Sequence, residues 1–275
     1  MKKLISGLFM GLALISLAAC GGGDDKPADT GSNGGNNAGE TDPGGNAPAA
    51  AAKDYTAADH TGGVKGQVTF GGERPEAKML PIGGDNVCMS AWADTKPSDP
   101  RTELGANGEV PHAFIKLTGA GVKAFKFGVE DAPTVVVDQK DCMYVPHVFG
   151  VMEGQDFVVK NSDETLHNVN AKPKRNDGFN KAQAKKGDQD TFNFGKKENA
   201  IAFGCDVHKW MSAWCFVSEH PLFATTDANG NFEISNVPDG EYEMVVWHEA
   251  FAKKVKKVSV KVEGGAVVEQ AVTLD

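Results

Sequence analysis

The chain has 275 residues, 33 of them glycine, and an aromatic content of 8%, which suits one or two compact domains with many turns. Its formal net charge is −9 at pH 7, so its charge balance excludes the basic surface that nucleic-acid binding requires. The chain has five cysteines, few enough to be considered one by one.

The first segment is a leader. Lys2 and Lys3 precede an apolar run from Leu4 to Ala19, which is short for a bilayer span but suits a secretory signal. The run ends in Leu17-Ala18-Ala19-Cys20-Gly21, which resembles a bacterial lipobox, where cleavage precedes the cysteine and the cysteine receives a lipid. An ordinary signal peptide cleaved at a small residue is the alternative.

We therefore expect residues 1–19 to be a lipoprotein signal peptide and Cys20 to be the lipidation site. Gly21 after the cysteine, in place of Asp, resembles lipoproteins that are sorted to the outer membrane. The implied location is the bacterial cell envelope, with a lipid anchor in the outer membrane and the protein facing the periplasm or the cell surface.

Residues 20–60 are predicted to be a disordered tether, because residues 21–52 contain almost no large apolar side chain. From residue 61 the composition changes. Val64–Phe70 alternates apolar and polar residues as a half-buried strand does. Residues 82–110 contain Cys88 and predict a long excursion. His112–Leu117 is a second predicted strand, in which His112 is expected to be structural. We expect residues 61–130 to contribute N-terminal strands to a β-sandwich.

Residues 131–219 predict a second set of strands, at 134–138, 156–161, 190–194, 200–203 and 212–217. Between them, residues 172–187 carry basic side chains against one Asp: Lys172, Lys174, Arg175, Lys181, Lys185 and Lys186. This basic segment either docks an acidic partner or is a solvated loop.

A short stretch of this segment concentrates metal-binding side chains. Cys205, His208 and Met211 place a thiolate, an imidazole and a thioether within seven residues, and His167 offers a second imidazole after a polar turn. Soft sulfur with imidazole favours copper, and two His, one Cys and a weak axial Met form a blue-copper site. A closed zinc site would want four strong ligands, and a disulfide through Cys205 is the other alternative.

The residues Asn161-Ser162-Asp163 with His167-Asn168-Val169, and Phe203-Gly204-Cys205 with His208 and Met211, resemble the cupredoxin family. The resemblance covers roughly residues 133–218, and we expect residues 131–219 to form a cupredoxin-like copper domain. It implies one type 1 copper ion bound by His167, Cys205, His208 and Met211. It also implies that Asn168 ties the two ligand segments together. In the family, electrons enter at the solvent-exposed edge of the His that corresponds to His208. Trp210 either lines a docking patch there or packs over the loop, and His147 lies either near the metal or in a structural role.

Three cysteines remain once Cys20 and Cys205 are assigned. Cys88, Cys142 and Cys215 allow three pairings in an oxidising compartment. We favour a disulfide between Cys88 and Cys142, because Cys215 lies within a predicted strand and can pack as a small apolar residue.

Residues 220–275 again predict strands and turns. Thr226-Asp227-Ala228-Asn229-Gly230-Asn231-Phe232 and Val237-Pro238-Asp239-Gly240-Glu241-Tyr242 resemble carboxypeptidase regulatory-like domains, which have a transthyretin-like β-sandwich. Such domains open with strands like those at residues 64–70 and 113–117. We therefore expect residues 61–130 and 220–275 to form one transthyretin-like sandwich, split around the cupredoxin-like domain. His248 is expected to be structural unless it lies beside the metal.

The predicted fold class is all-β, with two β-sandwiches. The predicted function is a lipid-anchored electron carrier with a redox protein such as a c-type cytochrome as partner. A copper-delivery protein without redox turnover and an adhesion or binding sandwich are the alternatives. No enzyme is expected, because the 7 His residues are scattered singly and form no His-x-His clusters.

Overall fold

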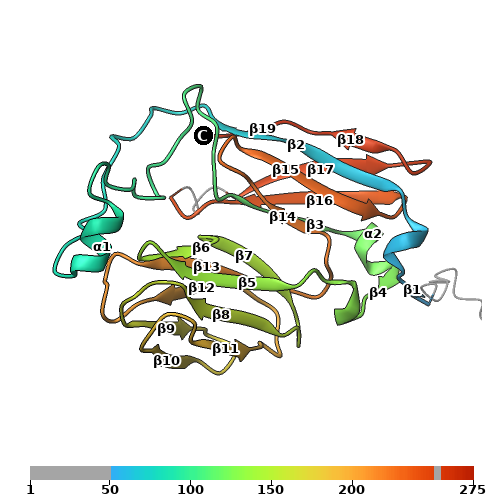
Figure 1. Cartoon of the computed structure of the whole chain (residues 1–275). Helices are drawn as coiled ribbons and strands as arrows, with labels where there is room; N and C mark the ends of the chain where they lie inside the picture. The colour runs from blue at the N-terminus through green and yellow to red at the C-terminus, as the bar shows by residue number, and fades with distance from the viewer. Residues whose placement is uncertain (1–50, 251–254) are drawn as a thin grey trace, which may run out of the picture. The chain divides into compact units, whose positions relative to one another are not determined.

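The structure is a computed structural model that describes residues 51–250 and 255–275. The predicted signal peptide, Cys20 and most of the predicted tether lie outside these residues. Within them, no helix has the length and apolar character needed to cross a membrane. Among the described residues β-strands far outnumber helices, so the predicted all-β fold class is confirmed (Figure 1).

The first sandwich consists of two sheets. One has the strand order β10 (Phe179–Gln183), β9 (His167–Lys172), β12 (Glu198–Gly204), β13 (Ser212–Ser218) and β7 (Val148–Met152). The other has the order β11 (Gln189–Phe192), β8 (Phe157–Asn161), β5 (Val135–Lys140) and β6 (Met143–Val145). β7 runs parallel to β13 and β5 parallel to β8, while the other pairs are antiparallel.

The second sandwich combines strands from both ends of the described chain. Its first sheet has the order β14 (Phe223–Thr225), β3 (Phe114–Thr118), β16 (Gly240–Trp247) and β17 (Lys256–Val262). In its second sheet β2 (Gly62–Phe70) pairs with β15 (Asn231–Val237), β18 (Val267–Glu269) and β19 (Val272–Leu274). These pairings are those of a sandwich split in the sequence, and its transthyretin-like character stays a prediction.

Short elements lie outside the sheets of the two sandwiches. β1 (Lys53–Asp54) pairs with β4 (Phe125–Lys126), and 3₁₀ turns occupy Ala57–Asp59 and Val129–Asp131. α2 (Ala120–Lys123) follows β3, and α1 (Asn86–Ala91) lies in the excursion predicted for residues 82–110. The Asp85 side chain caps α1 by accepting hydrogen bonds from the amides of Val87 and Cys88, which explains why the helix begins there.

Each sandwich has its own core because the strands alternate inward and outward side chains. In β8, for example, every second side chain from Phe157 to Asn161 is buried. β7 differs, since all five of its residues are buried. Val151 packs in the first core, and Val148 packs with Phe114 and Phe216 in a separate cluster. β7 is therefore apolar on both faces.

That separate cluster joins the two sandwiches. The rings of Phe114 in β3 and Phe216 in β13 stack with centroids 4.0 Å apart, a contact that contributes about 0.5–1.5 kcal/mol beyond simple burial. Gly150 in β7 is required here, because a Cβ at this position would lie 2.4 Å from the Phe223 ring. These contacts place β3 and β14 of the second sandwich against β13 and β7 of the first.

Candidate metal centre

The predicted ligands come from two adjacent places in one sheet. His167 is the first residue of β9, and the segment from Cys205 to Met211 is the loop between β12 and β13. β12 pairs with both β9 and β13, so the register holds the loop beside the start of β9. The structure thus brings together residues that are about 40 positions apart in the sequence.

Three of the predicted ligands form a compact set. The ligand atoms of His167, Cys205 and His208 all lie within 4.8 Å of one another, and the two histidine Nδ1 atoms are 2.9 Å apart. The exposed fractions of these residues are 0%, 4% and 2%, and that of Met211 is 1%. Met211 packs in the same core cluster as Cys205. The site is therefore closed to solvent.

The loop that carries the sulfur ligands is fixed by its own backbone. The Met211 amide donates to the His208 carbonyl at 2.9 Å, and the Cys205 amide donates to the Met211 carbonyl at 3.3 Å. The His208 amide also lies 3.3 Å from the Cys205 Sγ. Burial raises the pKa of this thiol, but hydrogen bonds from His167 and from backbone amides outweigh burial and lower it. The environment therefore favours the thiolate, which is the form that binds metals.

Asn168 connects the two ligand segments, in the manner that the resemblance implied. Its Oδ1 accepts a hydrogen bond of 2.6 Å from the Asp206 amide and lies 3.3 Å from the Cys205 Sγ. Its Nδ2 donates to the carboxylate of Asp206 and to the Oδ1 of Asn180. One side chain at the start of β9 therefore holds the first turn of the ligand loop in place.

Asp163 orients His167, a role that the sequence analysis did not assign. The Nε2 of His167 lies 2.9 Å from the Asp163 Oδ2, and since a carboxylate only accepts, Nε2 carries the hydrogen. The Nδ1 is thereby directed toward Cys205 and His208. Burial lowers the pKa of His167, but the bond to Asp163 dominates and raises it. Protonation at Nδ1 therefore competes with metal binding.

Asp163 also fixes the turn that carries Cys142. It accepts hydrogen bonds from the amides of Asp141 and Cys142, at 2.8 Å and 2.7 Å. Both residues have positive φ, of 53° and 56°, in the two-residue connection between β5 and β6. The only sequence signal for this role was an acidic residue in the polar turn four positions before His167.

The outer edge of His208 is covered, which corrects the expectation of a solvent-exposed imidazole. Its Nε2 lies 3.4 Å from the Asp85 Oδ2 and 3.6 Å from the Cys88 Sγ, both at the start of α1. Burial and the nearby His167 lower the pKa of His208. The expected exposure of His208 is wrong because the segment at residues 82–110, which carries α1, folds back over the ligand loop. The cupredoxin resemblance implied solvent at this place.

A disulfide holds this cover in place. Cys88 and Cys142 are bonded, which is the pairing favoured from the sequence, and they are 54 positions apart. Cys142 also lies beside Asp163 and His167, so the disulfide contacts the surroundings of both histidines. Cys215 is a free, fully buried thiol in β13, and burial raises its pKa well above the usual value.

The other histidines considered in the sequence lie outside the compact set. The Nδ1 of His147 lies 2.9 Å from the Ser212 carbonyl oxygen, and its Nε2 lies beside the Glu249 carboxylate, so His147 has a structural role. His112 pairs with Glu103 and has a φ of 60° in the turn before β3, so it is not a strand residue. His248 is buried at the end of β16, where the Ala250 amide donates to its Nδ1.

The donor set fits copper. A thiolate with two imidazoles and a nearby thioether is the combination that copper prefers, whereas magnesium and calcium require oxygen ligands. Zinc also accepts Cys and His, but a structural zinc site has four strong ligands and a catalytic one keeps an open position. The predicted set has three strong ligands and the burial described above, so neither zinc arrangement matches it.

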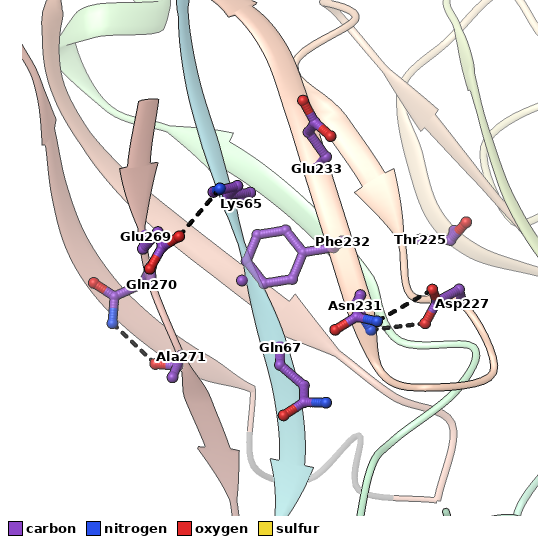
Figure 2. Close-up of a pocket in the computed structure, with 11 residues that line it drawn as sticks. Lys65, Gln67, Thr225, Asp227, Asn231, Phe232, Glu233, Glu269, Gln270 and Ala271 are labelled. Carbon is purple, nitrogen blue, oxygen red and sulfur yellow. Dashed lines mark hydrogen bonds and ion pairs between the residues drawn. The ribbon is translucent and has the colours of Figure 1, made fainter. Parts of the chain in front are cut away.

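A pocket away from the predicted ligands lies on the second sandwich. It has a volume of about 810 Å³ and is lined by residues of β2, β15 and β18 together with neighbouring loops. Figure 2 shows Lys65 and Glu269 paired on the neighbouring strands β2 and β18 that line it, with Nζ and Oε1 3.1 Å apart. Its lining contains neither cysteine nor histidine, so it is not a second copper site.

Comparison with known proteins gives one family match. The model of the family described as polysaccharide lyase family 4, domain II, matches residues 199–270. The matched segment begins in β12 of the first sandwich and ends beyond β18 of the second. It covers about a quarter of the chain. No curated protein matches the chain.

Solved structures similar to this chain include cupredoxins. Amicyanin from Paracoccus versutus is 21% identical, with 38% of this chain and 97% of that chain covered and a TM-score of 0.28. A purple cupredoxin from Nitrosopumilus maritimus is 18% identical, with 30% and 99% covered and a TM-score of 0.27.

A copper-containing nitrite reductase from Thermus scotoductus SA-01 is 17% identical, with a TM-score of 0.29. The match covers 31% of this chain and only 22% of the reductase. All three likenesses are confined to about a third of this chain, and the functional argument below rests on the site itself.

Proposed function

We propose that this protein carries single electrons through one type 1 copper ion bound by His167, Cys205, His208 and Met211. The observation that carries the proposal is a thiolate and two imidazoles within 4.8 Å of one another, in a site where no ligand residue is more than 4% exposed. When bound, copper supplies the one-electron couple between Cu(I) and Cu(II).

The protein contributes a rigid, dry environment for that couple. Asn168 holds the ligand loop, and Asp163 fixes the ring of His167 through its Nε2. His167 begins β9, and the other three ligands lie on the loop between β12 and β13 of the same sheet, so they are expected to keep their positions when the charge of the site changes. A closed site also supports electron transfer over substrate turnover, because no open position is available for a substrate.

The same burial argues against copper delivery. A protein that hands copper to an acceptor has to let the acceptor's ligands approach the ion. Here the Cys88–Cys142 disulfide and α1 cover His208, and the loop and sheet enclose Cys205. Release of copper would require these covers to open.

The proposal extends to the cellular setting. The lipobox-like sequence around Cys20 supports a lipoprotein of the bacterial envelope, and the tether would place the sandwiches away from the membrane. A redox protein such as a c-type cytochrome is the proposed partner. We propose no enzymatic activity, since the scattered histidines offer no second copper cluster among the described residues.

The spectrum of the copper-loaded protein tests the proposal. One equivalent of Cu(II) is added to the purified protein and to a Cys205→Ser variant, whose folding is checked by circular dichroism. We expect an intense blue thiolate-to-copper band that mild reductant bleaches and reoxidation restores, and that the variant lacks. A folded protein without the band would refute the type 1 site. A blue protein that surrenders Cu(I) to an acceptor without redox cycling would favour delivery.

A further inference from the structure

The cover over His208 raises the question of where an electron enters the site. The imidazole edge that would ordinarily meet a partner is 2% exposed and lies against Asp85 and Cys88. An electron that reaches His208 must therefore cross another side chain that touches the ring and also reaches the surface.

Trp210 is such a side chain. Its ring centroid lies 5.0 Å from that of His208, and its indole is only partly buried. Its Nε1 donates a hydrogen bond of 3.1 Å to the Cys142 carbonyl, which fixes the ring in that position. Trp210 thus links a buried ligand to the surface through a rigid π-system.

The surface that Trp210 reaches is hollowed. A pocket of about 560 Å³, which we call the Trp210 pocket, is lined by apolar groups and two basic side chains: Leu80, Val207, Trp210, Trp214, Arg101 and Lys209. Val207, in the ligand loop itself, is 49% exposed. Exposed apolar residues in a concave surface are typical of a protein-binding site.

The exposed charges at this pocket are positive. The side chains of Arg101 and Lys209 are 63% and 76% exposed, whereas the lining carboxylates of Asp99 and Glu249 are each 7% exposed. Asp206 lies 3.6 Å from the Lys209 Nζ but is held by three asparagine side chains and does not line the pocket. The Arg101 guanidinium is bonded to the buried Asp99 carboxylate. The charges that the pocket exposes to a partner are therefore the positive ones, although its lining holds two cations and two carboxylates.

The basic segment at 172–187 is a poorer candidate for the same role. Lys174 and Arg175 follow the end of β9 that is opposite to His167, which places them about 15–20 Å further along the strand direction. An electron entering there would have to cross the sandwich.

We propose, on the basis of the proposed function, that the Trp210 pocket docks an acidic redox protein and that the electron passes through Trp210 and His208. One electron leaves the partner's reduced centre, which is oxidised, and Cu(II) is reduced to Cu(I). No bond forms and no proton is transferred. The apolar lining supplies contact area, and Arg101 with Lys209 selects a partner surface rich in carboxylates.

A redox-inert anion locates the docking surface without any electron transfer. Hexacyanochromate(III), a paramagnetic trianion, is added to the isotope-labelled, metal-free protein, and the broadening of amide resonances is mapped. We expect broadening centred on Val207, Lys209 and Arg101, and its loss in Lys209→Glu. Broadening centred on residues 172–187, which Lys174→Glu abolishes while Lys209→Glu does not, would overturn the proposal.

The rates of oxidation by small ions test the electron path. Hexacyanoferrate(III) and tris(phenanthroline)cobalt(III), of opposite charge, oxidise the reduced copper protein in a stopped-flow instrument. Lys209→Glu should lower the rate of oxidation by the anion about threefold to tenfold and raise the rate of oxidation by the cation. Lys174→Glu should change neither rate. Trp210→Leu should slow both ions with the blue band unchanged.

The outcomes separate the two proposals. Unchanged rates in Trp210→Leu and Lys209→Glu, with the blue band present, would refute the docking surface and leave the carrier intact. Absence of the blue band in the wild-type protein would refute the carrier first. The metal-free broadening experiment still decides whether the pocket binds anions.

Discussion

Replacing Asp163 by Asn tests whether the ring of His167 is held by a charged partner. The Oδ2 of Asp163 accepts from the His167 Nε2 and the Cys142 amide, and its Oδ1 accepts from the Asp141 amide. An Asn whose oxygen takes the place of Oδ2 keeps the first two bonds. Its NH₂ group then faces the Asp141 amide, donor against donor.

Two effects of different size follow from this geometry. The donor–donor conflict in a buried turn should lower the free energy of unfolding by about 1–3 kcal/mol. The loss of the negative charge weakens the bond that orients His167, because charge-assisted hydrogen bonds are roughly twice as strong as neutral ones. A partner of this kind typically contributes about 10–100-fold to metal affinity, which corresponds to about 1.4–2.7 kcal/mol.

Glu198 provides a matched control away from the site. Its Oε1 accepts from the Lys174 amide, and its Oε2 accepts from the Arg175 amide and the Asn176 side chain. Glu198 and Asp163 are both 8% exposed. Glu198→Gln should therefore lose a similar amount of stability and leave the metal affinity unchanged.

Competition with a chelator for Cu(II) measures the affinity, and urea unfolding of the metal-free proteins measures the stability. We expect a loss of affinity of about 10–100-fold in Asp163→Asn only. An Asp163→Asn affinity within about twofold of wild type would contradict the orienting role. An equal loss of affinity in Glu198→Gln would show that general destabilisation is the cause.

Three further changes have clear expectations. Asn168→Ala should lower the free energy of unfolding by about 1–3 kcal/mol, because buried donors of the loop lose their acceptor, and urea unfolding measures this. The double variant Cys88→Ser, Cys142→Ser should lower the free energy of unfolding by about 4 kcal/mol in the same assay. It should also make His208 of the metal-free protein reactive toward diethyl pyrocarbonate. An unreactive His208 would show that α1 stays in place without the disulfide. Burial lowers the pKa of His220 to about 3 and of His248 to about 4, so both stay neutral when folded. The contribution of these neutral histidines to the free energy of unfolding should therefore be fully present above pH 6.5. It should fall as the pH drops, by about 2 kcal/mol per histidine at pH 5. His220→Gln should flatten the pH dependence, and an unchanged slope would exclude His220 as its source.

Local sequence patterns were sufficient for the ligand loop. Cys205, His208 and Met211 lie within one hairpin connection, so their proximity follows from the chain itself, and a strand before and after the loop is visible as alternation. The role of Asn168 was predicted from the resemblance to cupredoxins. Several strands of both sandwiches could likewise be predicted from their period of two. β7, which is buried along its whole length, and β10, which lies in the basic segment interpreted as a loop, were not predicted.

The partners of those strands were less accessible from the sequence. Parallel pairing of β7 with β13 and the location of β2 between β15 and β18 involve residues far apart in the chain, and side-chain alternation carries no information about which strand is the neighbour. The split sandwich was predicted only through a resemblance at the two ends of the chain.

The sequence by itself therefore determined the all-β class and placed three predicted donors, Cys205, His208 and Met211, on one loop, because both depend on residues close together in the chain. The fourth predicted donor, His167, lies about 40 positions upstream, and the tertiary structure brings it to the loop. Only the tertiary structure decided what surrounds the donors. Asp85 and Cys88 reach His208 because a disulfide and a helix cap hold a distant excursion over the loop. That cover depends on packing between segments with no shared local pattern, and it turns the expected exposed imidazole into a buried one.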